Sequence, residues 1–160
     1  MYDVMDVFKN KKMMVIFSWA MVVFWMLFIF ALSAQPATES GNLSKRVTEV
    51  IIKAVGRLVS LDIETDNTKD VVSKFDHIVR KCAHGAVYFI LGILTMNAFI
   101  TTGVKGYRAF VFSFLFCVIY AISDEIHQLF VPGRGAQAVD VLIDSIGAFV
   151  GIGLYSLLMR

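Results

Sequence analysis

Proline, cysteine and net charge are all scarce in this sequence. Only 2 of its 160 residues are proline, and neither interrupts an apolar stretch, which argues against the broken membrane helices of transporters. The two cysteines, Cys82 and Cys117, are too few for a disulfide framework, and their apolar neighbours are typical of helix packing. A net charge of +2 provides no broad basic surface, so we expect no nucleic-acid partner. Internal repeats are also lacking, and we expect a single domain over residues 1–160.

Apolar residues, in contrast, are abundant. They make up 58% of the chain, the mean hydropathy is +0.71, and 14 residues are phenylalanine. A helix rises about 1.5 Å per residue, so roughly 20 apolar residues cross a hydrocarbon core of about 30 Å. Four stretches reach this length, at about 13–32, 83–101, 108–128 and 139–159. Lipid cannot satisfy open backbone groups, so the sequence predicts an all-α membrane protein with four transmembrane helices.

The first apolar stretch also has features of a signal peptide. Lys9, Lys11 and Lys12 form a basic region before it, and Ala31-Leu32-Ser33 resembles a cleavage site. The apolar run is longer than the core of a usual signal peptide, which favours a retained helix.

A polar segment, residues 34–80, separates the first two spans. Within it, apolar residues recur at helical spacing, with basic and acidic residues among them. We expect an amphipathic helix that lies on the membrane surface or on the bundle. The charged stretch 62–69 is expected to be an exposed loop. The apolar positions of the amphipathic helix are Leu43, Val47, Val50, Ile51, Ala54, Val55 and Leu58.

Basic residues give conflicting indications of orientation. Lysines flank the first span closely, Lys105 and Arg108 fill the short loop between spans two and three, and Arg160 ends the chain. The positive-inside rule then places both termini in the cytoplasm. Counting all basic residues in the 34–80 loop favours the opposite orientation. We expect cytoplasmic termini, because much of the loop's positive charge belongs to the amphipathic helix or lies next to the polar cluster described below.

Polar and ionisable residues gather where the spans meet one membrane face. With four spans, the ends of the first and third share a face with the starts of the second and fourth. Burying a charge in a span costs at least a few kcal/mol. A polar cluster whose only role is to hold the helices together would therefore contain few ionisable residues. Four acids, three bases and two histidines exceed that need and favour a functional site. The candidates are Gln35, Arg80, Lys81, His84, Tyr88, Asp124, Glu125, His127, Gln128, Arg134, Asp140 and Asp144.

The residue types suggest how these candidates divide. Arg134, between two glycines, suits a phosphate or carboxylate, and we expect Gln35, Arg80, Lys81, Tyr88 and Gln128 to bind substrate beside it. His84 and His127 are candidate general acids or bases. Asp124, Asp140 or Asp144 can orient a histidine, and an aspartate can also act as a nucleophile. Glu125 is a further candidate catalytic residue.

Two comparisons of spacing bear on the chemistry. Arg134-x5-Asp140-x3-Asp144 is similar to the Arg-x5-His-x3-Asp motif of lipid phosphate phosphatases, with aspartate in place of the nucleophilic histidine. The density of acids and histidines is compatible with a divalent cation, but no His-Glu-x-x-His pattern supports one. We expect no cofactor, with a divalent cation as the open alternative.

The motifs at this face resemble those of the VanZ family of membrane proteins. They are Ser33-x-Gln35, Lys81-x-x-His84-x-x-x-Tyr88, Ser123-Asp-Glu-x-His-Gln-x-Phe-Val-Pro-Gly-Arg134 and Asp140-x-x-x-Asp144-x-x-Gly147. The resemblance covers most of the chain and implies a four-helix protein of the bacterial cell membrane. It also implies an association with resistance to the lipoglycopeptide teicoplanin, but it supplies no catalytic mechanism.

Two functions follow as expectations. One is an enzyme-like site, a hydrolase or transferase, acting on a lipid-linked or phosphorylated envelope substrate at the outer face. The other is a non-enzymatic binder of a lipid head group, a peptidoglycan precursor or a glycopeptide antibiotic. Membrane lipid or a lipid-linked cell-wall precursor is the expected partner in the enzymatic case. Separately, Gly147-x-x-x-Gly151 is expected to allow close helix packing.

Overall fold

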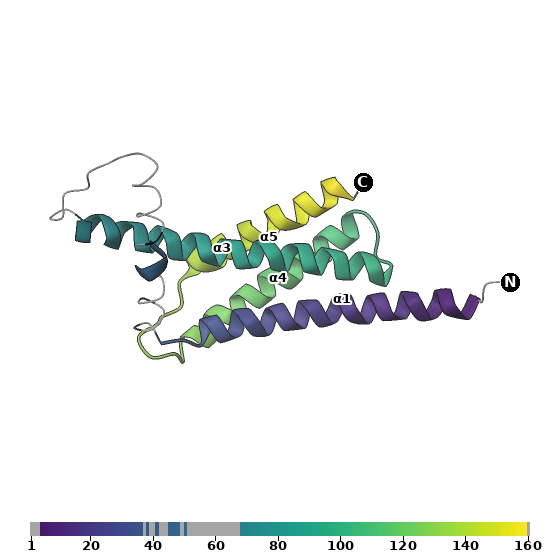
Figure 1. The fold of residues 1–160 in the computed structure, drawn as a ribbon, viewed down its shortest axis with the longest axis horizontal. Helices are drawn as coiled ribbons and strands as arrows, with labels where there is room; N and C mark the ends of the chain where they lie inside the picture. Colours follow the sequence, from purple (N-terminus) through teal and green to yellow (C-terminus); the bar gives the residue numbers. More distant parts are fainter. Residues whose placement is uncertain are drawn as a thin grey trace.

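Four long helices form most of the described part of the protein (Figure 1). The computed structural model describes residues 4–36, 38, 41, 45–48, 50 and 68–159, and these residues contain no strand. The helices are α1 (Val4–Ser33), α3 (Thr68–Thr102), α4 (Tyr107–Gln128) and α5 (Ala138–Leu158). Each contains a segment long and apolar enough to cross a membrane, at residues 10–33, 78–102, 107–128 and 138–158. The predicted all-α, four-span fold is confirmed.

The polar segment between the first two spans is more helical than expected. Helix α3 begins at Thr68, so residues 68–80, which we assigned to the loop, extend the second span. Residues 68–77 contain several charged side chains, so their composition does not mark them as part of a membrane helix. These charges are tolerated because residues 68–77 lie outside the apolar span, which begins at Ile78. Residues 62–67 lie outside the described residues.

A short helical piece supports the amphipathic helix expected in the loop. Residues 45–48 and 50 are helical, and the other positions of the expected helix, 43, 44, 49 and 51–58, lie outside the described residues. Thr48 is buried, and Val47 lies against a cavity that α1 and α3 also line. The described piece therefore packs on the bundle, which is one of the two positions expected for this helix.

Glycines allow α3 and α5 to run side by side in parallel. A Cβ atom at Gly147 would overlap the backbone of Gly85, and one at Gly151 would overlap the backbone of Phe89. At Gly92, it would lie 2.5 Å from the carbonyl oxygen of Ala148. The expected packing role of Gly147 and Gly151 is confirmed, and this close approach brings the polar starts of both spans together.

Hydrogen bonds attach α1 to the other helices. The Trp25 indole donates to the carbonyl of Val87 at 2.8 Å, and the Tyr120 hydroxyl donates to the carbonyl of Met26 at 2.6 Å. Deeper in the bundle, Asn97 donates to Ser18 at 3.1 Å and accepts from Tyr155 at 2.8 Å. These bonds place the end of α1 beside the start of the span in α3.

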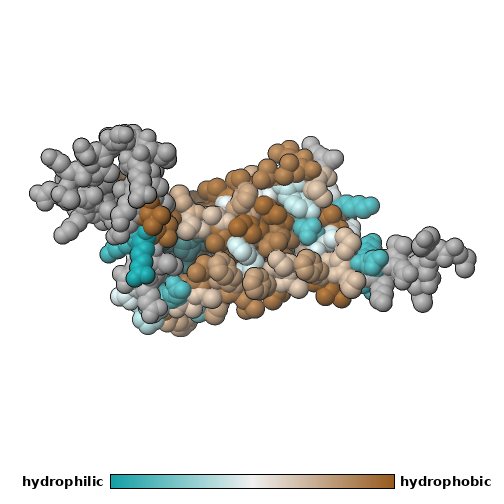
Figure 2. All heavy atoms as spheres, in the orientation of Figure 1, coloured by the Kyte–Doolittle hydropathy of each residue, from teal (hydrophilic) through white to brown (hydrophobic). Residues whose placement is uncertain are grey.

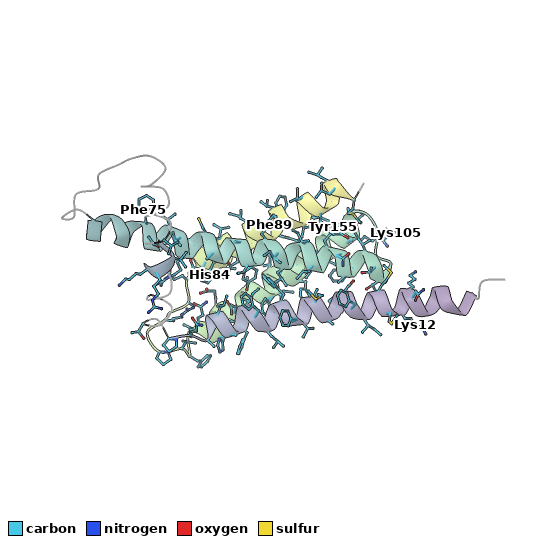
Figure 3. All side chains as sticks on the ribbon, viewed as in Figure 1. Lys12, Phe75, His84, Phe89, Lys105 and Tyr155 are labelled. Carbon is cyan, nitrogen blue, oxygen red and sulfur yellow. The ribbon has the colours of Figure 1, made fainter. Side chains whose placement is uncertain are left out.

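The surface divides into an apolar middle and polar ends. Figure 2 shows hydrophobic residues over the middle of the molecule and hydrophilic residues towards its two ends. Lys12 and Lys105 lie at one end of the bundle, and His84 lies towards the other (Figure 3). The basic flanks and the polar cluster are therefore at opposite ends, as a membrane-spanning arrangement requires.

Candidate functional site

The parallel packing of α3 on α5 brings together two pairs of ionisable side chains. Lys81 Nζ lies 3.0 Å from Asp140 Oδ1, and both side chains are mostly buried. One turn deeper, His84 Nδ1 lies 3.7 Å from Asp144 Oδ1. This second distance is too long for a hydrogen bond but fits a carboxylate that orients an imidazole, since such contacts are often loose without ligand. His84 then has Nε2 available for proton exchange with a ligand.

Helix α4 contributes two buried acids with different surroundings. Asp124 Oδ2 accepts a long hydrogen bond of 3.5 Å from Gln128, one turn away on the same helix. Glu125 Oε2 accepts a hydrogen bond of 2.7 Å from the backbone N–H of Gln137. Glu125 thereby holds the start of α5 and the loop that carries Arg134, so its geometry is that of a positioning residue.

Two cavities lie beside these residues. The larger, of about 180 Å³, is bounded by the end of α1, the start of the α3 span, Asp124 and Arg134. The smaller, of about 120 Å³, lies between α3 and the 133–137 loop, and its walls are polar side chains and glycines. Arg80, His84 and Arg134 line both cavities, and we call them the shared triplet. A ligand at the shared triplet would reach into both spaces.

Several buried polar atoms at this end have no hydrogen-bond partner among the described residues. Both carboxylate oxygens of Asp144 are in this state, although its side chain is 0% exposed. Burying a polar group without a partner costs free energy, and buried polar atoms of native proteins are usually bonded. The other atoms are Ser33 Oγ, Thr48 Oγ1, Tyr88 Oη, Asp124 Oδ1, Glu125 Oε1 and His127 Nδ1. If these residues served only to hold the helices together, their buried polar atoms would be expected to form hydrogen bonds with one another.

The cluster predicted from the sequence is only partly assembled around the cavities. The larger cavity is lined by Gln35 and Asp124 in addition to the shared triplet, and the smaller one by Lys81, Gln128 and Asp140. Tyr88, Glu125, His127 and Asp144 line neither. The ring of His127 instead packs on Phe30 of α1, with 4.3 Å between centroids. Of the two candidate histidines, His84 is therefore the one that can meet a ligand.

Sequence reasoning missed two parts of the site. Ser33 lines the larger cavity, and its motif with Gln35 was the available signal. The apolar wall of this cavity was not foreseen, because its residues look like ordinary span residues. It consists of Ile29, Leu32, Val47, Val79, Ala83 and Val87.

Two arginine side chains, Arg80 and Arg134, meet at the junction of the cavities. The side chain of Arg134 forms no ion pair with any residue that the structure describes. Burial lowers the pKa of Arg134 below its ordinary value, and the nearby charge of Arg80 lowers it further. A bound anion would relieve this repulsion, and planar guanidinium groups suit phosphate or carboxylate oxygens.

The acids and histidines do not form a metal site on their own. Within the part of the chain that the structure describes, no three histidine, cysteine, aspartate or glutamate side chains converge to hold a metal ion. The divalent cation left open by the sequence therefore gains no support from this geometry.

Comparison with known proteins identifies a family. A model of the VanZ/LLP1 family matches residues 17–159, nearly the whole chain. Comparison with curated proteins found no significant match, and comparison with solved structures found none either.

Proposed function

Because the chain belongs to the VanZ/LLP1 family, which links it to glycopeptide resistance, we propose that its polar cluster is an enzyme-like site acting on a lipid-linked or phosphorylated envelope substrate. In this proposal the protein lies in a bacterial cell membrane, and the resistance concerns teicoplanin. The substrate is a membrane lipid or a lipid-linked cell-wall precursor.

One observation carries the proposal. The carboxylate of Asp144 is buried behind His84 with no hydrogen-bond partner among the described residues, and Asp124 Oδ1 is in the same state at the wall of the larger cavity. Such costs persist where a ligand or a reaction requires them. Asp124 borders the space that a ligand at His84 would occupy, and Asp144 lies behind His84, away from that space.

The geometry supports a division of roles. Arg134 and Arg80 hold an anionic group, and His84, oriented by Asp144, exchanges a proton with the substrate or with water. Asp124 faces the same space and is the second candidate for proton transfer. Lys81 and Asp140 neutralise each other, so their contribution is to fix α3 against α5 and to complete the wall of the smaller cavity.

A comparison of the wild-type protein with a His84→Gln variant tests the reaction. Both are purified, incubated with an envelope lipid extract, and the phosphorylated lipids are followed by mass spectrometry. We expect the wild-type protein to convert at least one of these lipids and His84→Gln to lower that rate by about a hundredfold or more, the usual contribution of a general acid or base.

The control is His127→Gln, because this histidine lines neither cavity. It should keep most of the activity. If the wild-type protein binds phosphorylated lipids and converts none of them, the enzymatic proposal is wrong, and the non-enzymatic binder takes its place.

We also propose that the site serves the outer face, with both termini in the cytoplasm. Single cysteines at Ala136 and Lys105, in a background without Cys82 and Cys117, probe the two ends of the bundle, since both positions are exposed. An impermeant maleimide should label Ala136→Cys in intact cells and Lys105→Cys only after permeabilisation. The reverse pattern would invert the orientation.

A further inference from the structure

The larger cavity has an apolar side and a charged side. Its apolar side is formed by α1, by α3 and by Val47 of the short helical piece, and its charged side by the shared triplet and Asp124. The guanidinium groups of Arg80 and Arg134 and the carboxylate of Asp124 lie on the charged side, and Arg134 forms no ion pair with any described residue. A ligand that fits both sides has an apolar part joined directly to an anion.

The apolar side opens towards lipid. Ala83 lines the cavity and is nevertheless exposed, and Val47 is 44% exposed. Ala83 and Leu32 both lie inside the apolar spans, within a few residues of their ends. The opening is therefore at the depth where lipid chains meet their head groups, so a chain can enter from the membrane between α1 and α3.

The size of the cavity limits what enters. Its volume is about 180 Å³. A buried apolar cavity of about 150 Å³ accepts one benzene molecule. The cavity thus has room for the first carbons of one chain, whose remainder would continue into the membrane. Two acyl chains joined to one head group would not fit side by side in the cavity, so the second chain would be left outside it.

The smaller cavity continues the same path into polar surroundings. No large apolar side chain lines it, and its charged walls are Arg80, Lys81 and Arg134 against Asp140. It begins at the shared triplet, where the apolar cavity ends. A polar group attached to the far side of the anion would lie there.

We propose that the site takes a single-chain lipid phosphate, with its chain in the larger cavity between α1 and α3 and its phosphate at the shared triplet. A polar substituent on the phosphate occupies the smaller cavity. This assignment rests on the proposed function and adds the class of lipid. Prenyl and single alkyl chains share this chemistry, and the experiment below separates them.

Binding of defined lipids to the purified full chain, measured by native mass spectrometry, tests the assignment. The probes are farnesyl phosphate, dodecyl phosphate, phosphatidic acid and farnesol. Farnesyl phosphate or dodecyl phosphate should bind at least about tenfold more tightly than phosphatidic acid, which has two chains, and than farnesol, which lacks the phosphate. Tighter binding of farnesyl phosphate identifies a prenyl chain, and tighter binding of dodecyl phosphate an alkyl chain.

Two variants locate the chain and the phosphate separately. Ala83→Phe fills the apolar cavity and should weaken binding of the preferred phosphate about tenfold or more. Ala86→Phe, on an exposed position of the same helix that lines no cavity, should leave binding unchanged. Arg134→Gln should also weaken binding, because it removes a cation from the shared triplet. Unfolding temperatures of the three variants verify that each is folded.

The outcomes separate failure of the single-chain assignment from failure of the proposed function. If phosphatidic acid binds as tightly as the single-chain phosphates, or Ala83→Phe binds like the wild-type protein, the chain assignment is wrong. If Arg134→Gln still weakens binding in that case, the proposed anionic substrate survives. If Arg134→Gln has no effect and no phosphate binds, both proposals fail.

Discussion

Replacing Gly147 by alanine should lower the unfolding temperature of the protein by several degrees. The added Cβ would overlap the backbone of Gly85, which cannot move aside as a flexible side chain does. Overpacking of this kind typically costs about 1–3 kcal/mol, and in a chain of this length each kcal/mol shifts the midpoint by roughly 2–4 °C. Thermal unfolding of purified protein in detergent measures the change.

Gly153 provides a matched control on the same helix. A Cβ at this position meets no atom within 4 Å. Gly153→Ala should therefore keep the wild-type unfolding temperature. Equal midpoints for the Gly147 and Gly153 variants would contradict the close packing of α3 on α5.

The same substitution should also impair function. Separating α3 from α5 lengthens the distances from Lys81 to Asp140 and from His84 to Asp144, which are set by this packing. We expect lower glycopeptide resistance in cells that make Gly147→Ala than in cells that make Gly153→Ala at equal protein levels.

Replacing Asp144 by asparagine should abolish function without harming the fold. The side chain is 0% exposed, and neither carboxylate oxygen has a hydrogen-bond partner among the described residues. An ionised carboxylate in these surroundings costs several kcal/mol, and asparagine has almost the same shape without the charge. The unfolding temperature should be unchanged or higher, while resistance falls to the level of cells lacking the protein.

Asp144→Asn should lose resistance while keeping its stability only if the Asp144 carboxylate is needed for function. Ser145→Ala is the control, because this hydroxyl donates only to the carbonyl of Val141 within α5. It should change neither quantity appreciably. If Asp144→Asn unfolds several degrees earlier and resistance falls in proportion, Asp144 is structural. Full resistance in Asp144→Asn would also contradict its role at His84.

The spans were predictable because membrane thickness fixes their length. The expected and observed ends differ by a few residues, and the four-helix arrangement follows from apolar length alone. The start of α3 at Thr68 was not predictable in this way. Its first turns are rich in charge and lie outside the apolar span, so length and hydropathy do not mark them.

The position of the polar cluster was predictable, but the contacts within it were not. Helical spacing places Lys81, His84 and Tyr88 on one face of α3 and Asp124 near His127 on α4. Spacing cannot tell which neighbour each face meets. The rotation of α4 about its own axis decides these contacts. It directs His127 to Phe30 of α1 and places Asp124 at the cavity, because α1 packs on one side of α4 and α3 on the other.

The side-chain pairs between helices could not be predicted from the sequence either. The two pairs between α3 and α5 depend on the glycine contacts deeper in the membrane, which set the register of the two helices. Spacing marked Gly147 and Gly151 as packing residues but could not name Gly85 and Phe89 as their partners.

A structure of the protein in lipid nanodiscs, determined with the native lipids retained, tests the central claim most directly. The claim is that the polar cluster is a ligand site at the junction of two cavities. We expect density for an anionic head group within hydrogen-bond distance of Arg134 and His84, continuing as a chain between α1 and α3. Closed cavities, with Asp124 and Asp144 each hydrogen-bonded inside the protein, would contradict this claim and leave a purely structural cluster.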